Sequence, residues 1–288
     1  MEDKIYQFLN LASRMYYSGD PIIEDVVFDR LAESVGYNKL GTDTHATNTM
    51  LHAYPMFSLQ KYYEGESKPI PLPNGTKDTS PKIDGAAVSH LYLDGIHAAS
   101  LTRGDGLEGQ SVYDKFRDTN LIPHSIPTEH KLVQITGELA APINIPNARN
   151  YASGALNLKS VKEFKERTLE FFAYGVQPYQ TKSFREDMKL LSSWGFNTVK
   201  DDGIHNIYPC DGVVIRLDDY ELFDSLGYTS KHPRGAYAVK ERGASVETKL
   251  LDVIWQTGKT GKVTPVAILE PVMIGDALVS RATLNNIA

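Results

Sequence analysis

The sequence predicts an α+β fold with three parts: a helical N-terminal subdomain, a domain of antiparallel sheets and separate helices, and a partial β-barrel. Apolar residues recur at helical spacing in residues 3–17 and again in residues 25–35. An Asp94-Gly95 pair divides the alternating run 86–103, which is typical of a β-hairpin. From Thr248 onward the pattern is strand-rich and has no helical periodicity, as in the opening of a small barrel.

Turn-rich segments separate these parts. Residues 36–50 are polar and predict a linker, and residues 65–80 carry three prolines and predict a surface loop. The remaining periodic segments predict strands at 132–139, 169–176, 213–217 and 236–240, and helices near 158–166, 184–194 and 219–226. Strands in hairpins mixed with separate helices favour α+β over a doubly wound sheet.

Composition excludes several classes of protein. The chain has 288 residues, 41% hydrophobic and 23% charged, which is typical of a globular protein of two or more domains. A single cysteine, Cys210, allows no internal disulfide and favours a reducing compartment, so we expect a cytoplasmic protein. No apolar run approaches the roughly 18 residues of a membrane span, and we expect no membrane contact. The net charge is −6, so any contact with nucleic acid must be local.

A lysine and a carboxylate are predicted to share one pocket wall. Residues 80–85, SPKIDG, are expected to open the first strand of the hairpin. Lys82 and Asp84 are two residues apart, and side chains at that spacing leave a strand from the same face. Taken alone, a K-x-D-G segment is more often a surface ion pair, because three fixed letters recur by chance.

Further motifs follow in a fixed order. They are TRGDG at 102–106, Gly137-Glu138, NARN at 147–150, DGVVIR at 211–216 and AVK at 238–240. The set resembles the nucleotidyltransferase motifs of DNA ligases. Longer segments, among them LTRGDGLEGQSV, LEFFAYGV and WQTGKTGKVTPVAILEPV, are similar to the NAD-dependent (bacterial-type) DNA ligases in particular. The resemblance implies a helical subdomain that binds nicotinamide mononucleotide at 1–48, an adenylation (nucleotidyltransferase) domain at 49–247 and an incomplete OB-fold at 248–288.

The resemblance implies that Lys82 attacks the adenylyl phosphorus of NAD, releases nicotinamide mononucleotide and becomes a lysyl-AMP. The AMP would then pass to the 5′-phosphate of a nick in double-stranded DNA, which is sealed. Attack requires a neutral amine, whereas a free lysine has a pKa of about 10.4, so we expect this pKa to fall. The family pattern supplies Arg216 and Lys240 on neighbouring strands to repel the ammonium and hold the α-phosphate, with Asp84 beside them and Mg²⁺ sharing the charge.

Residue-by-residue matching extends the expected nucleotide site. Arg103 and Glu138 should meet the ribose hydroxyls, and Glu138 and Asp84 are candidates to place the metal. Ser58 and Leu59, in PMFSLQKYY, match the segment that lines the nucleotide pocket. Read without the family, Arg103 in a Gly-rich turn and Glu138 at a strand end are as readily ordinary surface residues.

The N-terminal segment YYSGDPIIEDVVFDRL resembles the nicotinamide-binding part of the NAD-dependent branch. The nicotinamide ring is cationic, so the aromatic faces of Tyr16, Tyr17 and Phe28 would attract it. Asp25 and Asp29 would add negative charge. Aromatic residues at helical spacing are otherwise more often part of a hydrophobic core.

Three residues are candidates for DNA contact. Asn147 and Arg149 match a loop near the nucleotide and the nick phosphates, and Arg281 lies within VSRATLNN.

About forty residues after Thr248 are too few for a five-stranded OB-fold. The chain is therefore expected to be either a fragment of a longer ligase or the large subunit of a split, phage-type enzyme. In the second case a second polypeptide would complete the barrel and supply DNA-clamping modules.

Two positions depart from the family pattern. Ser80 stands where the family has a Glu that reads the adenine amino group, so base recognition is expected to be looser or backbone-mediated. Arg216 stands where the family has Lys, and a guanidinium is bulkier, planar and permanently charged. Two other functions remain open from sequence: an ATP-dependent RNA ligase or capping-type nucleotidyltransferase, and a non-catalytic nucleotide-binding remnant.

Overall fold

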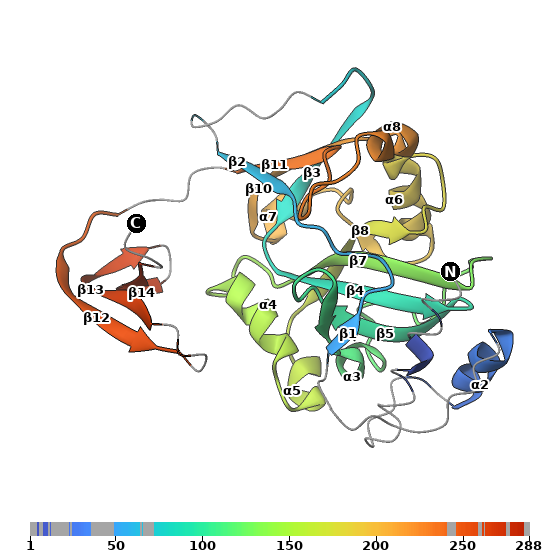
Figure 1. Cartoon of the computed structure of the whole chain (residues 1–288), viewed down its shortest axis with the longest axis horizontal. Coiled ribbons are helices and arrows are strands. Elements are labelled where there is room, and N and C mark those ends of the chain that lie inside the picture. Colours follow the sequence, from blue (N-terminus) through green and yellow to red (C-terminus); the bar gives the residue numbers. More distant parts are fainter. Residues whose placement is uncertain are drawn as a thin grey trace. The chain divides into compact units, whose positions relative to one another are not determined.

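A computed structural model describes residues 5, 8–10, 12, 23, 25–35, 49–63, 65, 72–240, 246–258, 261, 263–274 and 277–284. The chain divides into two compact units, Met1–Lys240 and Glu241–Ala288 (Figure 1). The larger unit contains a five-stranded and a four-stranded sheet, and the smaller one contains a three-stranded sheet. The strands pair mostly in antiparallel fashion, except that β11 (Ala236–Lys240) with β2 (Gln60–Tyr63) and β8 (Glu170–Gln177) with β9 (Asn197–Thr198) are parallel pairs. This mixture of sheets and short helices confirms the predicted α+β class.

The five-stranded sheet has the strand order β5-β4-β7-β8-β9. Its strands are β4 (Ala86–Leu93), β5 (Ile96–Thr102), β7 (Leu132–Ala140), β8 (Glu170–Gln177) and β9 (Asn197–Thr198). The β4–β5 hairpin turns at Asp94 and Gly95, whose φ angles of 46° and 77° are the left-handed values that an Asp-Gly pair adopts readily. The sheet is the centre of the largest hydrophobic cluster, in which Val133, Ile135 and Phe171 have no exposed surface.

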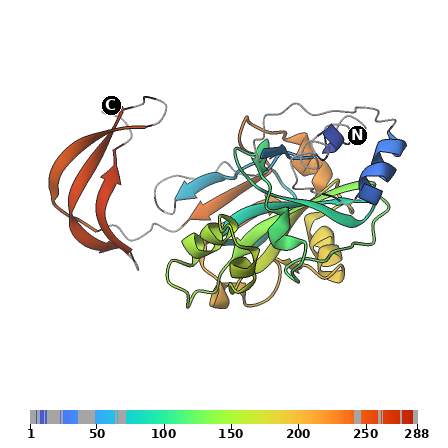
Figure 2. The same ribbon diagram turned by 90° about the horizontal axis from the view of Figure 1, so that it is seen from below.

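The N-terminal helical segments pack on this sheet. The described residues between 5 and 12 are helical, and helix α2 spans Asp25–Ser34, in agreement with the predicted helices. Leu9 and Leu31 are buried in one cluster with Leu91 of β4. Figure 2 shows α2, in blue, beside the sheet. Of the predicted linker 36–50, residues 36–48 lie outside the described part, and the last two begin strand β1 (Thr49–Leu51), which pairs with β6 (Glu108–Gln110).

The four-stranded sheet has the order β2-β11-β10-β3. Its strands are β2 (Gln60–Tyr63), β3 (Lys77–Ile83), β10 (Cys210–Leu217) and β11 (Ala236–Lys240). β10 lies between β3 and β11 and is antiparallel to both. The predicted strands at 213–217 and 236–240 are therefore neighbours in space.

Strand β3 corrects two expectations. Residues 77–80, expected in a surface loop, form its first half, and SPKIDG does not open the hairpin because β3 and β4 belong to different sheets. Six residues of β3 pair with residues of β10, which lies more than a hundred positions later in the chain. Local sequence carries no signal for such a distant pairing. After Ile83 the chain crosses to the other sheet, and the amide of Asp84 donates to the carbonyl of Pro209 at 2.8 Å.

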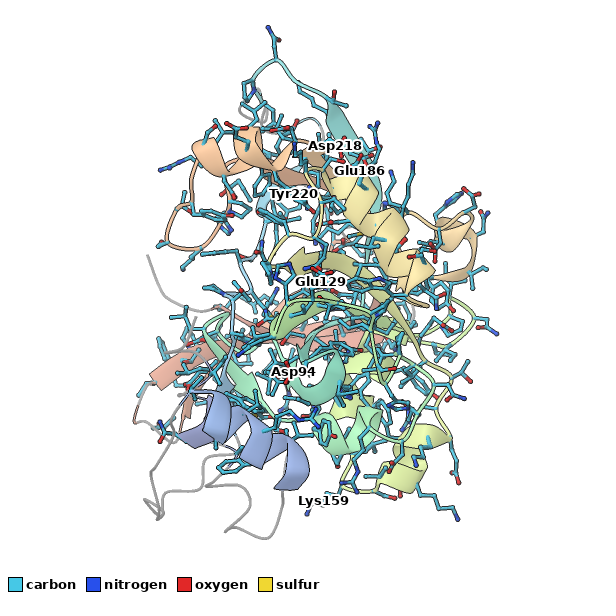
Figure 3. All side chains as sticks on the ribbon, turned by 90° about the vertical axis from the view of Figure 1, so that its right-hand side faces the viewer. Asp94, Glu129, Lys159, Glu186, Asp218 and Tyr220 are labelled. Carbon is cyan, nitrogen blue, oxygen red and sulfur yellow. The ribbon has the colours of Figure 1, made fainter. Side chains whose placement is uncertain are left out.

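Short helices flank the two sheets. They are α3 (Tyr113–Phe116), α4 (Ala148–Leu156), α5 (Val161–Lys165), α6 (Phe184–Ser193), α7 (Ile204–Ile207) and α8 (Tyr220–Ser225), and α5, α6 and α8 match the predicted helices. Ser183 caps α6 by accepting a hydrogen bond from the amide of Glu186, and Asp219 caps α8 in the same way. Figure 3 shows Glu186 and Asp218 close together, where α6 begins beside the end of β10.

The smaller unit is an antiparallel sheet of β12 (Leu250–Thr257), β13 (Val263–Ile274) and β14 (Ala277–Thr283). Three strands do not close into a barrel, as expected for a partial OB-fold. Across the described part of the whole chain, no helix is long and apolar enough to cross a membrane.

Candidate active site

A cavity of about 580 Å³ opens in the larger unit and is lined from its four-stranded and five-stranded sheets. The four-stranded sheet contributes Lys82 and Lys240, and the five-stranded sheet contributes Glu138 and Tyr174. Lys82 and Asp84 both line it, so they share a pocket as predicted, although Asp84 follows the end of β3 instead of lying within it.

One carboxylate joins two lysines at the centre of the cavity. Lys82 Nζ lies 2.9 Å from Asp211 Oδ1, and Lys240 Nζ donates a very short hydrogen bond to Asp211 Oδ2. Partial burial acts to raise the pKa of Asp211, but the hydrogen bonds from Lys240 and Lys82 outweigh it and hold this pKa below its ordinary value. The cluster therefore carries two ammonium groups and one carboxylate, a net positive charge suited to a phosphate.

Gly212 allows this cluster to form. Its φ of 151° lies in the region that L side chains rarely adopt, and a Cβ there would lie 2.1 Å from the carbonyl oxygen of Val239. The pairing of β10 with β3 shifts register between Cys210 and Val213, at the same place. This close approach of β10 to β11 brings Asp211 against Lys240.

The crossing between the sheets builds a second group of charges. A Cβ on Gly85 would lie 2.2 Å from the carbonyl oxygen of Leu139, so only glycine fits beneath β7. The amide of Gly85 donates to Glu138 Oε1 at 3.2 Å. Asp84 Oδ1 pairs with Arg149 Nη1 at 3.0 Å, and the Arg149 side chain, on α4, is 61% exposed at the cavity mouth.

Glu138 has an unusual environment for a carboxyl group. Burial raises its pKa from 4.5 to about 7, against the opposing effects of Lys82, the Gly85 amide and Arg103. Arg103 lines the same wall, and its carbonyl oxygen is 3.1 Å from the Nε2 atom of the buried His52. His52 Nδ1 is in turn 3.0 Å from Ser89 Oγ, so the Arg103 turn is braced from the sheet behind it.

Arg216 lies at the other end of the sheet face. Its guanidinium carbon is 4.0 Å from the centroid of the Phe184 ring and 4.8 Å from that of Phe223. Its Nε donates weakly to the carbonyl of Leu217 at 3.4 Å, and its side chain makes no other hydrogen bond to a residue that the structure describes. β10 and β11 are neighbours as predicted, but Arg216 opposes Asp78, four residues before Lys82.

The other predicted site residues lie in the cavity, outside the cavity, or in the N-terminal segment. Ser58 and Leu59 line the cavity, and Ser58 Oγ lies 3.0 Å from His232 Nδ1. Asn147 is exposed at the start of α4 with a left-handed φ of 51°, but it does not line the cavity, and Arg281 lies on β14 in the smaller unit.

The expected nicotinamide residues lie at the N-terminus. Phe28 is partly buried against the hydrophobic cluster of α2 and the five-stranded sheet. Asp25 and Asp29 lie on α2, whereas Tyr16 and Tyr17 are outside the described residues. The described residues of α2 do not line the cavity.

Sequence reasoning missed several cavity residues, of which two carry a polar group at the centre of the site or on its far wall. Asp211 and Tyr174 lie within DGVVIR and LEFFAYGV, segments that carried the family resemblance, but neither received a role. Their position inside these motifs was the sequence signal that could have marked them as site residues. The bulge that turns Asp211 toward Lys82, and the packing that places Tyr174 at the cavity, depend on the assembled sheets.

Comparisons with known proteins agree with this arrangement. The family described as the NAD-dependent DNA ligase adenylation domain matches residues 44–207, and the NAD-dependent DNA ligase OB-fold domain matches residues 247–288. A protein named DNA ligase from Acholeplasma laidlawii is 30% identical over 96% of this chain and 51% of its own length. The DNA ligases of Helicobacter pylori (strain J99) and Wolinella succinogenes are 31% and 35% identical, over 97% and 82% of this chain and 52% and 43% of their own lengths.

The chain thus spans about half the length of the curated relatives it matches. The matched adenylation domain covers more than half of the chain and contains Lys82, Asp84, Arg103 and Glu138. On this similarity, the chain belongs to the NAD-dependent DNA ligase family.

Proposed function

We propose that this chain catalyses the first step of ligation, the transfer of AMP from NAD to Lys82. Lys82 Nζ would attack the α-phosphorus, forming a nitrogen–phosphorus bond as the bond to nicotinamide mononucleotide breaks. The observation that supports this most directly is the cluster of Lys82, Asp211 and Lys240 inside a cavity large enough for a nucleotide. Catalysis by such a site depends on positioning and charge neutralisation.

Each neighbour of Lys82 has a role in this proposal. Asp211 holds the Lys82 side chain in the cavity before the nucleotide arrives, and Lys240 faces the α-phosphate as a fixed positive charge. Arg103 and Glu138, on the wall built by the other sheet, are placed to meet the ribose hydroxyls. Ser58 and Leu59 close the pocket from the segment before β2.

The donor set also suits Mg²⁺. No cluster of three or more His, Cys, Asp or Glu forms a metal cage among the described residues. Mg²⁺ is commonly held by one or two carboxylates together with phosphate oxygens and water, and Asp84, Glu138 and Asp211 line the cavity beside Lys82. These carboxylates would share the ion with the bound nucleotide, and the ion would neutralise charge on the α-phosphate.

We propose nicked double-stranded DNA as the acceptor of the AMP, in DNA replication and repair. Arg149 is suited to meet a phosphate at the cavity mouth, since its exposed guanidinium already pairs there with Asp84. Asn147 precedes it, and Arg281 on β14 is a further candidate. The domain boundaries 1–48, 49–247 and 248–288 and a cytoplasmic location belong to the same proposal.

Discrimination between NAD and ATP is assigned to the N-terminal segment. Tyr16, Tyr17 and Phe28 would offer faces to the cationic nicotinamide ring, and Asp25 and Asp29 would add negative charge. Support comes from the sequence of this segment and from its helix α2.

The test is the intact mass of the chain after incubation with NAD and Mg²⁺, and separately with ATP and Mg²⁺. We expect the gain of one AMP from NAD alone, and its complete loss in Lys82→Ala. Lys77→Ala is the matched control, because Lys77 is exposed at the start of the same strand and should label normally. An adduct formed from ATP would favour the RNA ligase or capping class, and failure of NAD to label a folded chain would contradict the proposal.

A further inference from the structure

The cavity face of the four-stranded sheet is organised in rows across the strands. Residues that pair directly across antiparallel strands point to the same face, as do residues two apart along one strand. The row nearest the reactive lysine contains Lys82 and Lys240. The pairing registers give two further rows, first Ser80, Val214 and Ala238, and then Asp78, Arg216 and Ala236.

Two members of the middle row, Ser80 and Val214, line the cavity and offer a seat for a flat group. Its side chains are small, and Tyr174 lines the same cavity from the opposite sheet. With the α-phosphate at Lys82, the base of the bound nucleotide would lie one row further on, about 7 Å along β3. This step rests on the proposed function.

The polar side chains of the sheet near that seat are a guanidinium and a hydroxyl. Arg216 borders it from the third row. Its side chain makes a single weak hydrogen bond to the residues that the structure describes, to the carbonyl of Leu217. Its guanidinium is held by the rings of Phe184 and Phe223 and borders the cavity. Ser80 contributes a hydroxyl, which can donate or accept.

Among the described residues, no carboxylate at this end lines the cavity. Asp78, which opposes Arg216, is buried and bound by Lys200 Nζ at 2.8 Å and Arg185 Nε at 3.2 Å. The acidic residues that line the cavity are Asp84, Glu138 and Asp211, which all lie at the Lys82 end. The amino group of adenine, a donor, therefore has no carboxylate to receive it.

We propose that the base end of this site accepts a 6-oxopurine as readily as adenine, so that nicotinamide hypoxanthine dinucleotide serves as a nucleotidyl donor. The guanidinium of Arg216 can donate to the purine O6 and N7 acceptors, the pairing that arginine makes with guanine in DNA. In the step itself, the Lys82 nitrogen bonds to the α-phosphorus and the bond to nicotinamide mononucleotide breaks. The products are lysyl-IMP and nicotinamide mononucleotide, and the lysine proton passes to solvent.

The experiment compares the two dinucleotides on the full chain with Mg²⁺, with intact mass and the rate of adduct formation as readouts. We expect the two values of kcat/KM to agree within about 3-fold. Ser80→Glu should restore a preference for NAD of about 10-fold or more, because its carboxylate accepts from the amino group and repels O6. Thr79→Glu is the matched control, since it adds the same charge to the exposed face of the same strand and should leave the ratio unchanged.

Either of two results would overturn the inference: a wild-type preference for NAD above about 10-fold, or a Ser80→Glu ratio no different from that of Thr79→Glu. Binding of AMP and of IMP, measured by calorimetry, separates this inference from the proposed function. If neither dinucleotide labels the chain but AMP and IMP bind equally, the proposed function fails and the base inference stands. If neither labels it and AMP alone binds, both fail.

Discussion

Replacing Glu138 with glutamine should stabilise the folded chain above neutral pH and have no effect at acid pH. The pKa of Glu138 rises from 4.5 in the unfolded chain to about 7 in the folded one, because the carboxyl group is buried. The folded state then binds this proton more tightly, so stability falls as the pH rises from about 4.5 to about 7 and is level beyond it. Each pKa unit corresponds to about 1.4 kcal/mol, so the ionised carboxylate costs at most about 3.5 kcal/mol.

Glutamine resembles the protonated carboxyl group and keeps an oxygen to accept the Gly85 amide hydrogen bond. We therefore expect Glu138→Gln to raise the free energy of unfolding by about 1 to 3 kcal/mol at about pH 8. Urea unfolding can be followed through Trp194 fluorescence in a Trp255→Phe background, because these are the two tryptophans of the chain. Glu166→Gln, at an exposed position, is the control. An equal gain at every pH, or no gain at pH 8, would refute the reasoning.

Further predictions concern the cluster at Lys82 and the sheet crossing. Asp211→Asn removes the carboxylate that pairs with Lys82. Adduct formation with NAD should slow by about 100-fold, while the midpoint of urea unfolding changes little. An unchanged rate of adduct formation would exclude a positioning role for Asp211. Gly85→Ala places a Cβ 2.2 Å from a carbonyl oxygen and should lower the free energy of unfolding by about 1 to 3 kcal/mol. Gly154→Ala, where a Cβ would meet nothing within 4 Å on helix α4, should instead raise it by about 0.5 to 1 kcal/mol, and a loss there would contradict this account.

Local chemistry explains the parts of the fold that could be predicted from sequence. The Asp94-Gly95 turn needs left-handed backbone at two successive residues, and the capped helices α6 and α8 begin directly after Ser183 and Asp219. Such signals are contained in a few consecutive residues. They were sufficient for the hairpin and three helices, because none of these depends on a distant partner.

Pairing between distant segments could not be predicted in this way. The first half of β3 has a loop-like composition, and it becomes a strand because β10 supplies its hydrogen-bond partners. The same pairing shifts register before Val213 and directs Asp211 toward Lys82. Family motifs identified Lys82 and Lys240, whereas the carboxylate between them follows from a bulge that a linear motif does not show.

The position of Lys82 follows from the way the chain changes sheets. Lys82 is the second-last residue of β3. Three residues later the chain passes beneath β7, where the space at position 85 admits only a glycine. That crossing brings the carboxyl group of Glu138, from one sheet, into the field of the Lys82 ammonium, from the other. A residue larger than glycine at position 85 would separate the two walls, so the glycine of K-x-D-G is required by the geometry of the cavity and not by the chemistry proposed for Lys82.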